Sequence, residues 1–410
     1  MYLTEEEQKM LDGENGPGCK FAMEILVAVG DAFGAEKMVP VRSAHTILST
    51  YKGILDAGVE AIEQFVALGA KAAIPTTTDP AGMDLERWTE FRVPEDYARK
   101  QFRIVKAVHS LGLIPCWTCT PYLAGLLPQK GDHLAWTESS AVVFANSMVG
   151  AYTNRETAVI DIAAAVTGRT PEHGLHLKRN RLGNVLIDVQ MEKMSAEDYR
   201  IFGYFMGKKA GARIPVITGL RKTDRIEDYI AMGAAAAASG GVALYHIVGI
   251  TPEAGSLEEA FGGNEPEKRF SFSLTEREQT KHDMCTGGGG DIEAVMVGCP
   301  HYTITDIKKA TELLEGKSVR KGLQFWIYTY KSIELLAERM GYKSIIEKAG
   351  AKITSDTCMM ISPTELWRFK TVMTDSGKFA YYAPSQVQAD VVFGSIEECV
   401  TAAVEKGRPV

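Results

Sequence analysis

The stretch of sequence that decides the fold runs from residue 294 to residue 358. It opens with AVMVGCPHYTITDIKKATELL (294–314), continues with GLQFWIYTYKSIELLAERM (322–340) and closes with KITSDTC (352–358). Short apolar runs alternate here with amphipathic helical patterns, which is typical of strands joined by crossover helices in a parallel sheet. We therefore expect a βαβαβ unit in which each strand is followed by a polar turn.

Three cysteines follow predicted strands. Cys299 stands in a GCPH segment, Cys358 in an SDTC segment, and Cys119, earlier in the chain, in a WTCTPY segment. In parallel sheets, ligands bind just beyond the carboxyl ends of the strands. Thiolates are soft ligands that suit an iron–sulfur cluster or zinc, and three of them would leave one metal position open for a substrate hydroxyl. Three buried thiols without a metal are the alternative interpretation.

The rest of the chain also alternates between helical and strand patterns. We expect an N-terminal α/β region (1–150) that contributes Cys119, a middle α/β region (151–285), and a C-terminal βαβαβ domain (286–410) that contributes Cys299 and Cys358. The pattern predicts helices at 5–33, 57–68, 96–111, 136–149, 195–211, 226–239, 305–314, 331–340, 344–349 and 395–406, and strands at 38–41, 71–75, 114–118, 184–189, 242–248, 294–297, 322–327 and 352–354. Residues 251–291 are interpreted as a connection with room for one helix. Its glycine run (287–290) lacks the Lys-Ser/Thr pair that a phosphate loop requires.

Composition excludes several classes of protein. The chain has 410 residues, 45% of them hydrophobic and 24% charged, which is typical of a globular protein of two or three domains. A net charge of -7 argues against a nucleic-acid partner. The polar start predicts no signal peptide, and the longest apolar stretch (230–248) contains polar residues, so we expect no membrane span. Seven scattered cysteines argue against a disulfide framework, and we expect a cytoplasmic protein.

Further polar residues are candidates for binding and catalysis. His45 follows a predicted strand and could act as an acid or a base. Glu138 and Ser139 open a predicted helix, where free N–H groups attract anions. Lys378 lies in a short polar loop, Asp-Ser-Gly-Lys, that suits anion binding. We expect catalytic roles for His45, Glu138 and Lys378.

A second set is expected to bind the substrate. Threonine and serine hydroxyls and the Asn-Arg pair of the TNRE segment can hold a carboxylate or a phosphate, and His301 can orient a metal ligand or a substrate hydroxyl. Helix capping, ordinary turns or a satisfied structural histidine would also account for these residue types. The expected substrate-binding residues are Ser43, Thr76, Thr77, Ser139, Asn154, Arg155, His301 and Ser376.

The chain resembles a known family over nearly its whole length. The segments that carry the resemblance are PTTTDPAGMD (75–84), TCTPY (118–122), AWTESSAVVFANS (135–147), TNRE (153–156), GCPH (298–301), SDTCMMISP (355–363) and TDSGKFAYYAP (374–384). They look like the aconitase X family in its separate large-subunit form. The resemblance implies an aconitase-like α/β fold, with several three-layer αβα domains and mostly parallel sheets around a central cleft.

The resemblance also implies a chemistry. It implies a hydro-lyase that removes water from a small hydroxy acid, with Cys119, Cys299 and Cys358 as ligands of an iron–sulfur cluster, either [4Fe-4S] or [2Fe-2S], or of mononuclear iron. Ile361 stands where ordinary aconitases have the second cysteine of a CxxC, so Cys119 would supply the third thiolate. A separate small subunit would supply the swivelling domain and a catalytic serine.

The family implies two substrates. WTC, DIAAAVTGR (161–169) and KFAYYAP (378–384) look closer to the cis-3-hydroxy-L-proline dehydratases, whereas TCTPY, PAGMD and SGK look closer to the mevalonate 5-phosphate dehydratases. On these motifs we favour cis-3-hydroxy-L-proline. A rival of another class is a zinc-stabilised, non-catalytic scaffold protein, in which the three cysteines and His301 close a tetrahedral site.

Overall fold

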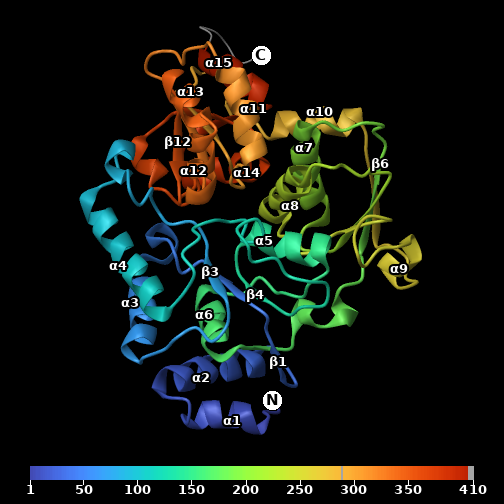
Figure 1. Cartoon of the computed structure of the whole chain (residues 1–410). Coiled ribbons are helices and arrows are strands. Elements are labelled where there is room, and N and C mark those ends of the chain that lie inside the picture. Colours follow the sequence, from blue (N-terminus) through green and yellow to red (C-terminus); the bar gives the residue numbers. More distant parts are fainter. Residues whose placement is uncertain (288–289, 405–410) are drawn as a thin grey trace. The chain divides into compact units, whose positions relative to one another are not determined.

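The computed structural model describes residues 1–287 and 290–404. The chain folds into two compact units, each built from separate stretches of sequence (Figure 1). Unit 1 comprises Met1–Gly82, Val93–Asn184 and Ala243–Glu265, and unit 2 comprises Met83–Arg92, Val185–Val242 and Pro266–Val410. The predicted boundaries at residues 150 and 285 stay a prediction.

Unit 1 holds a short parallel sheet. Strand β2 (Ala44–Thr46) lies between β3 (Thr76–Thr78) and β4 (Ala135–Trp136). Strand β1 (Met38–Pro40) pairs antiparallel with β5 (Arg169–Pro171). The remaining elements are α1 (Glu5–Asp12), α2 (Pro17–Ala32), α3 (Tyr51–Ala67), α4 (Glu95–Leu111), α5 (Ser139–Phe144), the π-turn η2 (Ala145–Val149), α6 (Ala158–Thr167), the 3-10 turns η3 (Gly174–His176) and η4 (Lys178–Asn180), β8 (His246–Ile247) and α9 (Leu257–Phe261).

Unit 2 is dominated by a five-stranded sheet in the order β12-β11-β10-β13-β14, with every neighbouring pair parallel. Its strands are β10 (Ala294–Val297), β11 (Gln324–Thr329), β12 (Lys352–Ser355), β13 (Thr371–Thr374) and β14 (Asp390–Phe393). In a second group, β6 (Val185–Val189) pairs in parallel with β7 (Pro215–Thr218) and β9 (Lys268–Phe272). The helices and 3-10 turns are η1 (Trp88–Phe91), α7 (Ala196–Ala210), α8 (Ile226–Gly240), α10 (Leu274–Asp283), α11 (Ile304–Leu314), α12 (Lys331–Arg339), α13 (Tyr342–Lys348), η5 (Thr364–Trp367), α14 (Gly377–Gln386) and α15 (Ile396–Val404).

The core of unit 2 follows from the two-residue repeat of its strands. Alternate residues of β10, β11 and β12 point to one face, where they pack on α11, α13 and α15. This apolar cluster includes Val295, Val297, Phe325, Ile327, Ile353, Ile307, Leu314, Ile346 and Val400. The α/β class with several parallel sheets is therefore confirmed, and the predicted βαβαβ unit is present.

Several predicted elements were wrong in unit 1. The expected helix at 5–33 breaks into α1 and α2, because Gly13 takes φ +93° and Pro17 starts a new helix. The strand expected at 71–75 lies instead at Thr76–Thr78, because the amides of Ala72 and Ala73 bond to Leu111 and Ala165 outside the sheet. The strand expected at 114–118 is reduced to a single bridge from Ile114 to Thr77.

Other corrections concern lengths. The helix expected at 136–149 begins only at Ser139, after strand β4, and ends in the π-turn η2. The strand expected at 242–248 is only β8, and the connection at 251–291 contains α9, β9 and α10. The middle of the glycine run (288–289) and the end of the expected last helix (405–406) lie outside the described residues.

Candidate metal and substrate site

Cys299 and Cys358 lie at the same edge of the five-stranded sheet. Strands β10 and β12 both pair in parallel with β11, and the cysteines stand two and three residues beyond their carboxyl ends. Neighbouring strands are about 4.8 Å apart, so the two strands are roughly 10 Å apart. Each cysteine is only 8% exposed. The order of the strands thus brings two sulfur donors to one rim.

His301 ties the two cysteine loops together. Its Nε2 lies 2.8 Å from the carbonyl oxygen of Thr357, the residue before Cys358. A carbonyl only accepts, so Nε2 must carry the proton. His301 therefore holds the Cys299 loop against the Cys358 loop, a positioning role consistent with the place predicted for it beside the cysteine.

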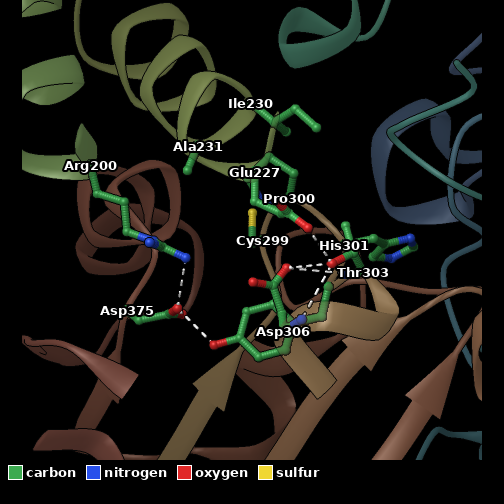
Figure 2. Close-up of a pocket in the computed structure, with 11 residues that line it drawn as sticks. Arg200, Glu227, Ile230, Ala231, Cys299, Pro300, His301, Thr303, Asp306 and Asp375 are labelled. Carbon is green, nitrogen blue, oxygen red and sulfur yellow. Dashed lines mark hydrogen bonds and ion pairs between the residues drawn. The ribbon is translucent and has the colours of Figure 1, made fainter. Parts of the chain in front are cut away.

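Ser376 and Asp375 brace the Cys299 loop from strand β13. The hydroxyl of Ser376 donates to the carbonyl oxygen of Cys299 and also caps α14 by accepting from the amide of Phe379 at 3.0 Å. Asp375 accepts a 2.7 Å hydrogen bond from the hydroxyl of Tyr302 and pairs with Arg200 at 3.2 Å. Arg200, Cys299 and Asp375 line a small recess of about 20 Å³, and Figure 2 shows these three residues around it.

Sequence reasoning missed Arg200, Tyr302, Asp306 and Asp375. Tyr302 and Asp375 directly follow and precede predicted site residues, so their position in the sequence was a usable signal. Arg200 lies on α7, far away in sequence, and nothing local connects it with Cys299. Asp306, whose carboxylate completes the capping box of α11 with Thr303, lines the same recess, and burial raises its pKa to about 6.

The Cys358 loop is shaped by Asp356. Asp356 adopts a left-handed backbone (φ +63°), and its carboxylate accepts a 3.1 Å hydrogen bond from the amide of Lys331. Burial raises the pKa of this carboxyl to about 7. Thr357 exchanges a 2.9 Å hydrogen bond with Ser362. The loop is therefore held by one hydrogen bond from the start of α12 and by one within the loop itself, and the cysteine lies at the rim.

Tyr328 lies on β11, between the two strands that lead to the cysteines. Its phenol oxygen is buried and has no hydrogen-bond partner in the described part of the chain. Burial and, after it, the charge of Cys358 raise the pKa of Tyr328 well above its usual range. A buried donor without an acceptor is costly, so this corner of unit 2 suits a group that brings acceptor atoms, such as sulfide.

The polar edge of unit 1 lies on β2 and β3 themselves. His45 is fully buried; its Nδ1 is 2.9 Å from the hydroxyl of Thr77, and its Nε2 is 3.6 Å from Asp79. Burial lowers the pKa of His45 to about 4, so it is neutral at pH 7. Because a carboxylate only accepts, the proton belongs on Nε2 and Thr77 donates to Nδ1.

The other predicted residues of this edge make local interactions. The hydroxyl of Ser43 accepts from the indole N–H of Trp136 at 3.2 Å, and the hydroxyl of Thr76 donates to the carbonyl oxygen of Ile74. Glu138 caps α5: its Oε1 accepts from the Ser140 amide at 3.1 Å and from the hydroxyls of Ser140 and Ser139. These bonds fix the shape of the edge.

Cys119 belongs to unit 1 and is 7% exposed. The turn before Cys119 is bonded to the end of β3. The amide of Trp117 donates to the hydroxyl of Thr78 and the amide of Thr118 to its carbonyl oxygen, and Trp117 has a left-handed backbone (φ +47°). The neighbouring Cys116 donates its thiol to the carbonyl oxygen of Thr78, and burial raises its pKa to about 11.

The three remaining predicted residues, Asn154, Arg155 and Lys378, differ in their exposure and in their hydrogen bonds. The Asn154 amide is committed to the next turn, where it accepts from the Leu175 amide at 2.7 Å and donates to the carbonyl oxygen of His173. Arg155 is exposed. Lys378 is half-buried in the first turn of α14. Of the two cations, Arg155 is the more exposed and therefore the more accessible to an anion.

The two units hold the predicted metal ligands separately, Cys119 in unit 1 and Cys299 with Cys358 in unit 2. Among the residues that the structure describes, no three His, Cys, Asp or Glu side chains form a group that could hold a metal ion. No helix in that part of the chain is both long and apolar enough to cross a membrane.

Parallel sheets, one with two cysteines beyond its carboxyl edge, define an α/β protein with a candidate metal site, and comparison with known proteins gives its family. Models of the aconitase X first, second and third domains match residues 1–179, 183–282 and 292–405. The chain belongs to the aconitase X family. The predicted family and the predicted class of enzyme, a dehydratase (hydro-lyase), are confirmed.

Individual relatives agree. The chain is 41% identical to the phosphomevalonate dehydratase large subunit of Methanocaldococcus jannaschii, over 97% of this chain and 99% of the relative. It is 33% identical to the cis-3-hydroxy-L-proline dehydratase of Pseudomonas aeruginosa, over 97% of this chain and 69% of the relative. The holo-form crystal structure of Thermococcus kodakaraensis aconitase X matches with a TM-score of 0.88 and 36% identity, covering 98% of this chain and all of that one.

Proposed function

We propose that this chain is the large subunit of a dehydratase that removes water from mevalonate 5-phosphate. The observation that carries the choice of substrate is similarity along the full length. Five relatives named phosphomevalonate dehydratase large subunit are 30–42% identical, and the chain covers 96–100% of each. Two relatives named cis-3-hydroxy-L-proline dehydratase are 30% and 33% identical, and the chain covers 68% and 69% of them.

The second candidate substrate is cis-3-hydroxy-L-proline. The segments WTC, DIAAAVTGR and KFAYYAP, which look closer to the cis-3-hydroxy-L-proline dehydratases, favour this substrate. Both candidates carry a hydroxyl β to a carboxylate, so they pose the same chemical problem. They differ in charge, because only mevalonate 5-phosphate adds a phosphate that needs cationic partners.

We propose that Cys119, Cys299 and Cys358 hold an iron–sulfur cluster. Burial of all three thiols and the unpartnered Tyr328 hydroxyl beside Cys358 fit a group that brings metal and sulfide. When bound, an open iron site would supply Lewis-acid polarisation of the substrate hydroxyl.

The chain's own residues would bind the substrate and position the ligands. Arg155 supplies an exposed guanidinium for a carboxylate, and Lys378 a second positive charge suited to a phosphate. His301 and Ser376 hold the Cys299 loop through the carbonyl oxygens of Thr357 and Cys299. His45 is kept neutral by burial, so it serves as a hydrogen-bonding group rather than as a cation.

The proposal includes a partner. Relatives of matching length are named as large subunits, and we propose a small subunit that supplies a mobile domain and a catalytic serine. That serine would take the proton α to the carboxylate. We also propose that the complex works in the cytoplasm.

The test is an assay of both substrates with the co-expressed, anaerobically purified complex. Turnover of mevalonate 5-phosphate, with slow or no turnover of cis-3-hydroxy-L-proline, is expected. The opposite preference would replace the proposed substrate by the second candidate. Turnover of neither, in colourless protein with one tightly held zinc, would instead favour the zinc-stabilised scaffold.

A further inference from the structure

A row of buried titratable side chains runs through unit 1. The ring nitrogens Nδ1 of His133 and His176 are 2.9 Å apart, and the two rings stack at 5.1 Å between centroids. On its other side, Nε2 of His176 lies 3.6 Å from Oε1 of Glu156. His176 is 3% exposed and Glu156 6%, whereas His133 is half-buried.

The middle of this row is incompletely bonded. Neither Nε2 of His176 nor Oε1 of Glu156 has a hydrogen-bond partner within residues 1–287 and 290–404. Two buried polar atoms left unpaired cost roughly 1–3 kcal/mol each. Because they face each other at 3.6 Å, a small side-chain movement or one bridging water would satisfy both.

The contact between the two histidines determines where the protons lie. One Nδ1 must donate and the other accept. If His176 donated, its bare Nε2 would face a carboxylate oxygen, and two acceptors would oppose each other in a buried place. If His133 donates, His176 carries its proton on Nε2, directed at Glu156. The second arrangement gives every atom of the row a complementary neighbour.

The row ends at the carboxyl edge of the unit 1 sheet. The amide of Glu156 bonds to the carbonyl oxygen of Trp136, the last residue of β4, at 3.4 Å. Thr137, the next residue, donates its hydroxyl to the buried Asp161, and its amide bonds to the carbonyl oxygen of His45. Burial raises the pKa of Asp161 well above its usual range, and the charge of Glu156 adds to this shift.

Asn154 holds the turn that carries His176. Its Oδ1 accepts from the amide of Leu175, and a Cβ on Gly174 would lie 2.3 Å from this oxygen. Gly174 has φ +54°, so the turn requires a residue without a side chain. The Asn-Arg-Glu segment therefore supplies both Glu156 and the residue that positions its partner.

We propose that Glu156, His176 and His133 form a proton relay between the half-buried His133 and the carboxyl edge of the unit 1 sheet. The inference rests on the proposed dehydration, in which a base takes a proton from carbon while the leaving hydroxide gains one. In one passage a proton arrives at Nε2 of His133, the Nδ1 proton moves to His176, and the Nε2 proton of His176 moves to Glu156. Glu156 then releases its proton to the leaving hydroxide. In the reverse passage Glu156 receives the proton taken from carbon and a proton leaves from Nε2 of His133, which restores both tautomers.

The charged neighbours of the row are compatible with a neutral relay. Asp132, Glu172 and Arg181 face His133, while His173 and Asp161 face Glu156. Burial, followed by His176, lowers the pKa of His133 to about 4. At pH 7, His133 is therefore neutral and passes a proton on without storing it.

The first test is the tautomer of each histidine in the full chain labelled with ¹⁵N-histidine. Resonances are assigned from those lost in the His133→Gln and His176→Gln variants. The relay requires that His133 carries its proton on Nδ1 and His176 on Nε2. A proton on Nδ1 of His176 would overturn it, whatever the enzyme's substrate proves to be.

The second test is kinetic and uses the complex that turns over its substrate. His176→Gln should lower kcat about tenfold or more with little change in KM, since proton transfer typically contributes a factor of about 10²–10⁴. Its solvent deuterium isotope effect on kcat should exceed that of the wild type. His109→Gln is the control: this exposed histidine lies near the end of α4, outside the relay. Wild-type kcat and isotope effect in His176→Gln would refute the relay.

Discussion

At the scale of single residues, burial shifts the pKa of several ionisable groups away from their usual values in water. His45 is the clearest example, with no exposed surface and a pKa lowered to about 4 by burial. In the unfolded chain its pKa is about 6.5. The unfolded state therefore binds more protons between these values, and the contribution of His45 to stability falls as the pH drops from about 6.5 to about 4.

A comparison of variants isolates this effect. Above pH 6.5, His45→Gln should destabilise the chain by its lost packing and hydrogen bonds alone. Below that pH the difference from the wild type should shrink by up to about 1.4 kcal/mol per pH unit. Urea unfolding of both proteins at a series of pH values measures it. Buried carboxyls such as Asp161 shift both proteins equally, so a difference independent of pH would contradict the prediction.

Residue types with a strong local signal could be predicted from the sequence, whereas partnerships between distant residues could not. Cysteines directly after apolar runs predicted Cys299 and Cys358 at strand ends, and both are there. His133, Glu156 and His176 share no short motif, so only the folded chain brings them together. Arg200 and Asp375 also lie far apart in the sequence, so their ion pair could not be predicted from a local pattern.

At the scale of elements, helices and strands with a strong hydrophobic periodicity were predicted well, whereas very short strands were not recognised. The helix at 96–111 and strands β10, β11 and β12 repeat over enough residues to be recognised, whereas β13 and β14 were not predicted. Strand β4 has only two residues, so its pattern merged with the following helix. The threonines of β3 looked like a turn, because their burial depends on neighbouring strands that the local sequence does not reveal.

The close approach of β10 and β11 gives a prediction at this scale. A Cβ at Gly298 (φ +97°) would lie 2.3 Å from the backbone oxygen of Tyr328, whereas at Gly322 (φ +95°) it would meet open space. Both alanine variants should lose about 1–2 kcal/mol for the left-handed backbone. Gly298→Ala should lose about 1–3 kcal/mol more from overpacking and should also lose iron, because its loop carries Cys299.

Chemical unfolding together with iron analysis of the two variants checks this. The Gly322→Ala protein should keep its iron content. Equal stabilities and equal iron contents would mean that the turn before Cys299 tolerates a side chain, and that the loop is not fixed by its contact with β11.

At the scale of the whole molecule, the proposed chemistry depends on both units. Unit 2 provides two cysteines tied by the His301–Thr357 hydrogen bond, and unit 1 provides the third together with the polar edge around His45. Neither unit alone has the complete proposed ligand set. The family resemblance connected the three cysteines from sequence, while the hydrogen bonds that hold their loops became visible only in the fold.

The most direct test of this account is the iron and acid-labile sulfide content of the anaerobically purified complex, measured for the wild type and for Cys119→Ala, Cys299→Ala and Cys358→Ala. We predict a brown wild-type protein with comparable amounts of iron and sulfide, and three colourless variants that have lost the metal and the dehydratase activity. A wild type that is active without iron, or a Cys299→Ala protein that keeps its colour and full activity, would contradict the proposed cluster.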